Sequence, residues 1–225
     1  MLAELEKAIG LKFNNKDLLR SACIHRSYLN EHPEESLPHN ERLEFLGDSV
    51  LGFVVSEYLY KNYPTHPEGD LTNFRSSIVN AKTLAETAKK LNLGKFLLLS
   101  KGEEATGGRE RQYLLANTFE ALLGAVYLDG GIDRAVHLIG RELLPQLDKI
   151  ISHKLYRDFK SLLQEKTQEK INVTPIYRVL EEKGPDHSRI FRVGVYAESK
   201  KLSEGEGRSK QEAEQEAAKE ALAKL

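Results

Sequence analysis

Apolar residues in the first two thirds of the chain recur at intervals of three and four positions. Residues 2–9 show this spacing, and residues 18–22 repeat it. Side chains at these intervals lie on one face of an α-helix. No stretch before about residue 150 has the period of two that is typical of a half-buried strand. The pattern therefore predicts an all-α domain, which we place at residues 1–147.

Two polar segments divide this helical region. Residues 64–69 (PTHPEG) contain prolines and a glycine, and residues 102–108 (GEEATGG) are polar and rich in glycine, so both are predicted loops. Residues 71–91, between them, have the pattern of one helix. Residues 113–128 form an unusually apolar helix that ends at an Asp-Gly-Gly sequence, and we expect it to be buried at the centre of the domain.

The pattern changes after residue 157 from helical to alternating. An amphipathic helix at 158–168 is followed by three short strands, which begin near Thr174, near Phe191 and near Lys201. The Gly-Pro-Asp sequence at 184–186 indicates a turn between the first two strands.

The last segment, residues 209–225, is a predicted helix with a narrow alanine stripe that suits close packing on a sheet. Ser209 and Glu212 form the sequence signature of a capping box at its start. The order α-β-β-β-α predicts a small α+β domain at residues 158–225. Residues 148–157 (DKIISHKLYR) are the predicted linker between the two domains.

The composition is that of a folded, water-soluble protein. Of the 225 residues, 40% are hydrophobic and 30% are charged, and the net charge of −1 does not indicate a nucleic-acid partner. The single cysteine, Cys23, excludes an intramolecular disulfide and fits a reducing compartment. No apolar run approaches the roughly 18 residues that span a bilayer, and the N-terminus lacks a secretory signal. We therefore predict a cytoplasmic protein with no membrane partner.

The segment NERLEFLGDSVL, residues 40–51, concentrates acidic residues on a predicted helix. Glu41, Glu44 and Asp48 are three and four positions apart and would share one helix face. Like charges at this spacing destabilise a helix by about 0.2–0.5 kcal/mol per pair. Gly47 costs about 1 kcal/mol relative to Ala in a helix, and it therefore indicates the close approach of another segment.

This acidic face has two interpretations: a solvated helix surface, or one half of a cation site. Glu120 favours the second, because it stands in the apolar helix at 113–128, where a carboxylate is rarely left unpaired. Mg²⁺ prefers oxygen ligands, and carboxylates from two crossing helices would hold it for phosphodiester hydrolysis. The seven histidines show no zinc-ligand spacing, and the sequence indicates no small-molecule cofactor.

Four ordered motifs resemble those of the ribonuclease III family. Residues 40–51 resemble its signature motif, and residues 114–131 (LLANTFEALLGAVYLDGG) resemble its second acidic motif. Residues 23–32 (CIHRSYLNEH) and 67–76 (PEGDLTNFRS) resemble its flanking segments. The second half of the chain resembles a double-stranded-RNA-binding domain. The resemblance covers essentially the full length, in the order of the short bacterial enzyme.

The resemblance implies a role for each acidic residue. The catalytic residues would be Asp48, Glu120 and Glu44, and the ligands of Mg²⁺ would be Glu44, Asp48, Asn117 and Glu120. Mn²⁺ is expected to substitute for Mg²⁺. Glu41 and Glu68 match accessory acidic positions that line the channel of the cleaved strand.

The resemblance also implies the activity and the assembly. The enzyme would cleave double-stranded RNA and leave 5′-phosphate and 3′-hydroxyl ends with short 3′ overhangs. Ribosomal RNA precursors and structured messenger RNAs would be its substrates. Phe45 would insert into a socket on a second subunit, so that a homodimer carries two active sites along one RNA-binding valley.

Asn117 departs from the family pattern, in which this ligand is often Asp. An amide oxygen coordinates Mg²⁺ but carries no charge, so we expect weaker metal affinity without loss of activity. Two alternatives stay open at this stage. One is a catalytically weak or inactive protein that binds duplex RNA, and the other is a nuclease for DNA or hybrid duplexes.

For the second domain, the resemblance implies contacts with 2′-hydroxyls and phosphates across two minor grooves. The expected contact residues are Ser161, Gln164, Glu165, Gln168, His187, Arg208, Ser209 and Lys210. The run of lysines common in this module is replaced by Arg-Ser-Lys-Gln at 208–211. Residues 158–225 carry 13 basic and 13 acidic side chains, so we expect modest phosphate attraction that added salt weakens steeply.

Overall fold

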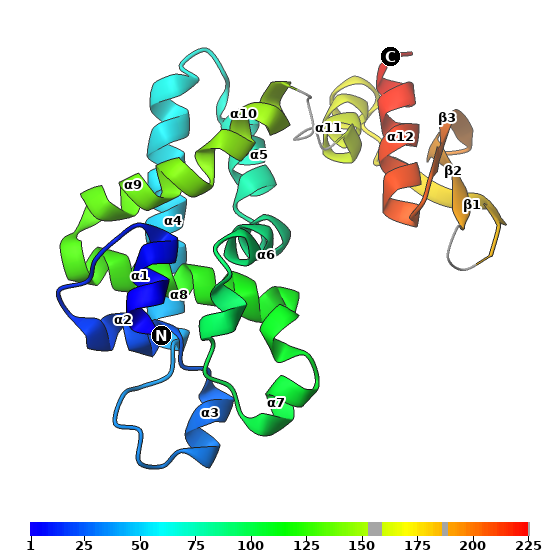
Figure 1. The fold of residues 1–225 in the computed structure, drawn as a ribbon. Coiled ribbons are helices and arrows are strands. Elements are labelled where there is room, and N and C mark those ends of the chain that lie inside the picture. Colours follow the sequence, from blue (N-terminus) through cyan, green and yellow to red (C-terminus); the bar gives the residue numbers. More distant parts are fainter. Residues whose placement is uncertain (153–158, 186–188, 225) are drawn as a thin grey trace. The chain divides into compact units, whose positions relative to one another are not determined.

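The computed structural model describes residues 1–152, 159–185 and 189–224 (Figure 1). The chain divides into two compact units, residues 1–156 and 157–225. Among the described residues, no helix is both long and apolar enough to cross a membrane.

The described part of the first unit is helical, as the sequence pattern predicts. Its α-helices are α1 (Leu2–Ile9), α2 (Lys16–Ala22), α3 (Arg26–Glu31), α4 (Glu41–Asn62), α5 (Glu68–Ile78), α6 (Ala81–Lys90), α7 (Lys101–Ala105), α8 (Gln112–Gly130), α9 (Ile132–Glu142) and α10 (Leu144–Ser152). Two short 3-10 helices, η1 (Leu93–Phe96) and η2 (Gly108–Glu110), join them. Ile24 and Leu98 form an isolated parallel bridge beside the start of α4.

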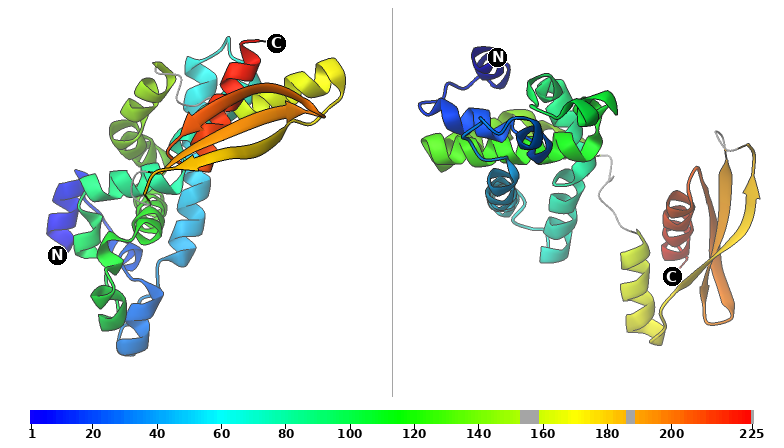
Figure 2. Two further views of the ribbon diagram at one scale, coloured as in Figure 1. Left: turned by 90° about the vertical axis from the view of Figure 1, so that its right-hand side faces the viewer. Right: turned by 90° about the horizontal axis from the view of Figure 1, so that it is seen from below.

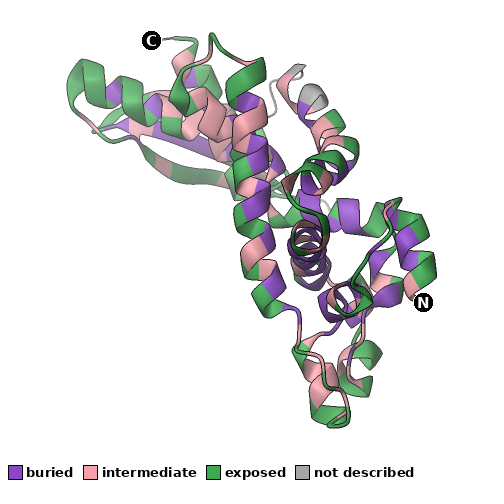
Figure 3. Ribbon diagram, turned by 90° about the vertical axis from the view of Figure 1, so that its left-hand side faces the viewer, coloured by how far each residue is buried: buried purple, intermediate pink, exposed green. Residues whose placement is uncertain are grey.

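Helix α8 forms the centre of this unit, as its apolar sequence predicts. Most of its residues from Leu114 to Val126 are buried, including Phe119 with no exposed surface (Figure 3). Helix α4 packs across it and alternates buried with exposed positions along its length. The remaining helices surround this pair, so that α4 and α8 share one hydrophobic core.

The prediction of a single helix over residues 71–91 is wrong. The structure has two helices there, α5 and α6, because Asn80 adopts an extended conformation with φ −151° and ψ 156°. The Asn80 side-chain oxygen accepts a hydrogen bond from the Thr83 backbone N–H at 3.0 Å, which caps the new helix. A cap of this kind begins a helix even where the apolar spacing continues through it.

The prediction of a loop over residues 102–108 is also wrong in its first half. Helix α7 begins at Lys101, where the Ser100 hydroxyl accepts a hydrogen bond from the Glu103 backbone N–H at 3.2 Å. Gly107 follows with a φ of +81°, a conformation that glycine adopts without strain, and it separates α7 from η2.

The second unit has the predicted order α-β-β-β-α. It contains α11 (Phe159–Ile171), β1 (Ile176–Lys183), β2 (Ile190–Ala197), β3 (Lys200–Gly207) and α12 (Lys210–Leu222). The three strands form one antiparallel sheet in the order β1-β2-β3. Both helices lie on the same face of this sheet (Figure 2).

The alanine stripe of α12 packs on the sheet as expected. Ala213, Ala217, Ala218 and Ala221 are buried. A Cβ atom added at Gly205 of β3 would lie 2.2 Å from the Ala217 backbone nitrogen, so helix and strand are in backbone contact. The Ser209 hydroxyl accepts from the Glu212 N–H at 3.1 Å, and this confirms the predicted cap.

The predicted linker, residues 148–157, begins inside a helix. Helix α10 continues to Ser152, and residues 153–157 lie outside the described residues. The segment therefore starts as the end of the first unit's last helix.

Candidate functional site

The two acidic helices cross in direct backbone contact at a pair of glycines. A Cβ atom at Gly47 of α4 would lie 1.7 Å from the Glu120 carbonyl oxygen of α8. A Cβ atom at Gly124 of α8 would lie 2.2 Å from the Leu43 carbonyl oxygen. Gly47 is therefore the close-approach point that its position in the sequence indicates. Gly124 is its counterpart on α8.

This crossing brings together the four side chains that the sequence singles out as metal ligands. Gly47 lies between Glu44 and Asp48 along α4, and Glu120 of α8 lies against it. Asn117 stands one helical turn before Glu120, and its side chain hydrogen-bonds to the Glu44 carboxylate. Glu44, Asn117 and Glu120 are half-buried, whereas Asp48 is exposed.

The carboxylates of this cluster repel one another in a partly dehydrated site. Burial, followed by the charges of Asp48 and Glu44, raises the pKa of Glu120 to about 7. Burial, followed by the charges of Glu41 and Asp48, raises the pKa of Glu44, and the hydrogen bond from Asn117 opposes that rise. The interactions that act on these two pKa values include no basic side chain. A cation would relieve this repulsion.

The donor set fits a hard divalent cation. Three carboxylates and one amide oxygen are the ligands that Mg²⁺ and similar ions prefer in proteins. Within the described ranges, no three His, Cys, Asp or Glu side chains already converge closely enough to enclose a metal ion. The backbone crossing places the four donors near one another, and a shared cation would require their side chains to rotate toward it.

The two accessory acids occupy different surroundings. Glu41 lies within 3.6 Å of the Arg26 guanidinium, whose positive charge partly balances that of the carboxylate. The His39 ring lies 3.8 Å from the same carboxylate. Glu68 is exposed in the first turn of α5, where its carboxylate accepts a hydrogen bond from the Thr72 hydroxyl at 2.9 Å. The charges that raise the pKa values of Glu44 and Glu120 include Glu41 but not Glu68.

Asn40 is a structural residue of this site that the sequence pattern did not single out. Its side chain is 4% exposed, and its amide donates to the Ala22 carbonyl at 3.4 Å. Its backbone N–H donates to the Ile24 carbonyl at 2.8 Å. These bonds anchor the start of α4, which sets the position of Glu44. An Asn immediately before a helix was the signal available in the sequence.

Phe45 projects from α4 on a different side from the core. Its side chain is 79% exposed, beside a cavity of about 660 Å³. The cavity is lined by Leu18, Ser21, Pro38, His39, Glu41, Arg42, Leu43, Phe45, Leu46 and Leu128. Phe53 and Tyr60 of the same helix are also exposed, at 58% and 75%.

The expected RNA contacts of the second unit lie on its surface. Ser161, Gln164, Glu165 and Gln168 are exposed on α11, and Arg208, Ser209 and Lys210 are exposed at the start of α12. Lys210 pairs with Glu182 at 3.1 Å and lies over the Phe191 ring. Glu212 accepts a hydrogen bond from the Arg208 N–H at 2.7 Å, so the start of α12 is already capped. His187 lies outside the described residues.

The two units match two known domain families. Residues 15–147 match the family described as Ribonuclease-III-like, and residues 159–225 match the double-stranded RNA binding motif. The chain belongs to the ribonuclease III family. It is therefore an endoribonuclease for double-stranded RNA, with a helical nuclease domain followed by an RNA-binding domain.

Individual relatives match this ribonuclease III chain over nearly its whole length. Ribonuclease 3 of Carboxydothermus hydrogenoformans is 49% identical over 221 residues, which are 98% of this chain and 94% of the relative. Ribonuclease 3 of Dehalococcoides mccartyi is 47% identical, again over 98% of this chain and 93% of the relative. The solved nuclease domain of ribonuclease III from Campylobacter jejuni gives a TM-score of 0.58 at 40% identity, over 63% of this chain and 94% of that chain.

Proposed function

We propose that the crossing of α4 and α8 is a Mg²⁺-dependent centre that hydrolyses phosphodiester bonds in duplex RNA. The observation that carries the proposal is the cluster at Gly47, where acids with raised pKa values face one another without a basic partner. Glu44, Asp48, Asn117 and Glu120 would hold the cation, and Mn²⁺ would replace Mg²⁺. When bound, such an ion lowers the pKa of coordinated water and neutralises charge on the phosphate.

The protein's own residues divide the remaining work. The exposed Asp48 carboxylate is the part of the cluster most accessible to a phosphate that approaches from solvent. Glu120 lies deeper, and without a cation burial and the charges of Asp48 and Glu44 raise the pKa of its carboxylate to about 7. A bound cation would offset this rise and keep the carboxylate ionised as a ligand. Glu44 is oriented by its hydrogen bond from Asn117. Glu41 and Glu68 would line the path of the cleaved strand.

Membership of the family supports a proposal for the products and the substrates. The proposed cleavage leaves 5′-phosphate and 3′-hydroxyl ends with short 3′ overhangs. Ribosomal RNA precursors and structured messenger RNAs, met in the cytoplasm, are the proposed substrates. The second domain would bind the duplex through the exposed faces of α11 and of the start of α12.

Cleavage of a long RNA duplex across a Mg²⁺ titration tests this function. Cleavage is expected to require the cation, to be supported by Mn²⁺, and to spare a DNA duplex of the same sequence, since 2′-hydroxyl contacts are absent there. Binding of the RNA duplex is measured in parallel by fluorescence anisotropy. Intact binding with no cleavage at any concentration of either ion would leave a protein that only binds duplex RNA.

Asn117→Asp is expected to lower the Mg²⁺ concentration for half-maximal cleavage by about 3- to 10-fold, since ligand charge strengthens binding of hard cations. The change adds a fourth formal negative charge to the donor set. Asn117→Ala, which removes the donor oxygen, should shift the half-maximal concentration the opposite way. The measurement is the initial cleavage rate over a range of Mg²⁺ concentrations. Identical titration curves for the wild type and Asn117→Asp would exclude Asn117 as a ligand.

The proposed assembly is a homodimer formed through α4. The exposed Phe45 ring and the cavity beside it lie on one surface. In a two-fold contact, the Phe45 ring of each subunit would enter the cavity of the other. The related domain from Campylobacter jejuni is described as having a region involved in dimer formation.

Phe45→Ala is expected to weaken the dimer by about 30-fold or more, as truncation of an aromatic anchor does at other interfaces. Sedimentation velocity over a range of protein concentrations gives the dissociation constant. Val136→Ala is the matched control, because Val136 is an apolar residue 40% exposed on α9. An unchanged dissociation constant in Phe45→Ala would remove Phe45 from the interface.

A further inference from the structure

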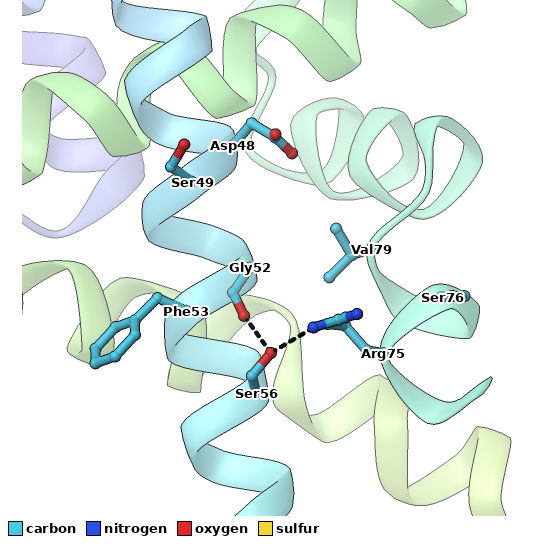
Figure 4. Close-up of a pocket in the computed structure, with 8 residues that line it drawn as sticks. All are labelled: Asp48, Ser49, Gly52, Phe53, Ser56, Arg75, Ser76 and Val79. Atoms are coloured by element: carbon cyan, nitrogen blue, oxygen red, sulfur yellow. Dashed lines mark hydrogen bonds between the residues drawn. The ribbon is translucent and has the colours of Figure 1, made fainter. Parts of the chain in front are cut away.

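A cleft between α4 and α5 opens beside the acidic cluster. It has a volume of about 470 Å³ and is lined by Asp48, Ser49, Gly52, Phe53, Ser56, Arg75, Ser76 and Val79 (Figure 4). Asp48 therefore belongs both to the acidic cluster and to the wall of this cleft. Arg75 is the basic residue of the lining, and it extends from α5 toward α4.

A hydroxyl relay fixes the Arg75 guanidinium in this cleft. Its Nη1 donates to the Ser56 hydroxyl at 3.0 Å, and that hydroxyl donates to the Gly52 carbonyl at 2.6 Å (Figure 4). A guanidinium has five N–H donors, so one bond to Ser56 leaves donors for a ligand. Ser49 and Ser76 add two more hydroxyls to the same cleft.

Arg75 also differs from most arginines of its domain in having no carboxylate partner in the described part of the chain. Six other arginines of the domain form ion pairs: Arg20, Arg26, Arg109, Arg111, Arg134 and Arg141. Arg42, which borders the Phe45 cavity, is the other one without such a pair within those ranges. A positive charge that is oriented by a hydroxyl and lacks an acid beside it suits an anionic ligand.

The spacing of the cleft residues along α4 indicates which anion the Arg75 guanidinium would bind. Asp48, Gly52 and Ser56 are four residues apart and share one helix face. Asp48 and Ser56 differ by a rise of about 12 Å, at 1.5 Å per residue. The guanidinium beside Ser56 is thus offset from the phosphate at the acidic cluster and suits another phosphate further along the strand.

Gly52 keeps the cleft open between these two points. A Cβ atom added there would meet no atom within 4 Å, so the helix itself does not need a glycine at this position. The missing side chain leaves room for a ribose-phosphate backbone to pass from Asp48 toward Arg75.

We propose that Arg75, oriented by Ser56, is a subsite for a phosphate of the cleaved RNA strand that flanks the scissile one. The proposal rests on the proposed function, since it assigns a second contact to the same substrate. Its role is positioning: binding a flanking phosphate holds the strand in register with Asp48 and its neighbours. Arg75 would take no part in the bond cleavage itself.

The test pairs protein variants with single neutral linkages in the RNA. Methylphosphonates are placed one at a time at phosphates flanking the cut site in a defined duplex. At one position the substitution should lower wild-type kcat/KM by about 10-fold, as loss of a charge-assisted contact does. On the unmodified duplex, the kcat/KM of Arg75→Gln should be about 10-fold below that of the wild type. On the duplex with the methylphosphonate at that position, the variant and the wild type should differ by less than about 2-fold, because the contact is already lost.

Two further variants calibrate the effect. Arg75→Lys keeps the charge but not the fork of donors, and it should recover part of the loss. Lys7→Gln on α1 removes one exposed charge far from α4 in the sequence, and it should match the wild type. Duplex binding is also measured without divalent cations over a range of salt concentrations. The slope of the logarithm of the binding constant against the logarithm of the salt concentration should be smaller by about one in Arg75→Gln only.

The outcomes separate this subsite from the function on which it rests. Wild-type protein that never cleaves RNA would contradict the proposed function, and the binding measurement would still test Arg75. An active wild type with Arg75→Gln equal to Lys7→Gln in cleavage and binding would overturn the subsite alone. The subsite would also be overturned if, at every methylphosphonate position, the fold-losses in kcat/KM from Arg75→Gln and from the methylphosphonate multiplied as independent effects do. Dissociation of Arg75→Gln into monomers in sedimentation would assign Arg75 to a subunit contact instead.

Discussion

Glu120→Gln is expected to lower the cleavage rate of duplex RNA by about 10³-fold or more while duplex binding is retained. The substitution keeps the shape of the side chain and removes its negative charge. Glu120 lies at the Gly47 crossing beside Glu44 and Asp48, so its charge is one of those that a cation there would need. Single-turnover cleavage and fluorescence anisotropy on the same duplex measure the two effects separately.

The matched control is Glu86→Gln, which removes an exposed carboxylate from α6 of the same domain. It should cleave at the wild-type rate. A Glu120→Gln variant that cleaves within about tenfold of the wild type, a difference of 1.4 kcal/mol in the barrier, would show that Glu120 is not catalytic.

The raised pKa of Glu120 adds a pH signature to this prediction. The folded protein holds the Glu120 proton more tightly than the unfolded chain, because the pKa rises from 4.5 to about 7. Without metal, this group's contribution to stability is present below pH 4.5 and is lost as pH rises toward 7. The Tm of the wild type should therefore fall relative to that of Glu120→Gln over this window. Added Mg²⁺ should raise the Tm of the wild type again, because the cation binds the ionised carboxylate.

Gly47→Ala is expected to destabilise the nuclease domain and remove most of its activity. The added Cβ would lie 1.7 Å from the Glu120 carbonyl oxygen, which is backbone and cannot rotate away. Helices α4 and α8 must separate to admit it, at a cost of about 1–3 kcal/mol or more for overpacking. Separation also moves Glu44 and Asp48 away from Glu120, so activity should fall more than the folded fraction does.

Thermal unfolding measures the first effect, with a fall in Tm of about 2–4 °C for each kcal/mol in a domain of this size. Gly140→Ala on α9 is the control, because a Cβ atom there would meet no atom within 4 Å. It should leave Tm unchanged or raise it, as Ala favours a helix over Gly by about 1 kcal/mol. A Gly47→Ala variant as stable and as active as Gly140→Ala would contradict the tight crossing.

The sequence predicted the crossing better than it predicted the local elements. A glycine within an acidic helix and an acid within an apolar helix each violate a local preference, and both violations meet at Gly47 and Glu120. Gly124 carries the same helix cost as Gly47, but its sequence neighbours do not indicate what approaches it. Its role depends on which helix lies across it, and periodicity carries no such information.

The two wrong elements have a local cause. Asn80 and Ser100 each start a new helix with one side-chain hydrogen bond, to Thr83 and to Glu103. The apolar spacing passes through Asn80 without a break, and the glycines after Ser100 suggested a loop. Both caps were visible as residue types, but apolar periodicity and glycine content outweighed them in the prediction.

The cleft that holds Arg75 was outside the reach of sequence reasoning. Six other arginines of this domain have an acidic partner in the described part of the chain. Which arginine lacks one depends on the packing of α5 against α4. The placement of Arg75 beside Ser56 and in one cleft with Asp48 likewise depends on tertiary packing.

The most direct test of the central claim is the location of Mn²⁺ in crystals of the protein soaked with that ion. Anomalous difference density is expected between α4 and α8, within bonding distance of oxygens of Glu44, Asp48 and Glu120, with the Asn117 amide oxygen facing it. The same soak of Glu120→Gln crystals should give weaker density or none. Well-ordered density elsewhere on the wild-type protein, with none at the Gly47 crossing, would contradict the account.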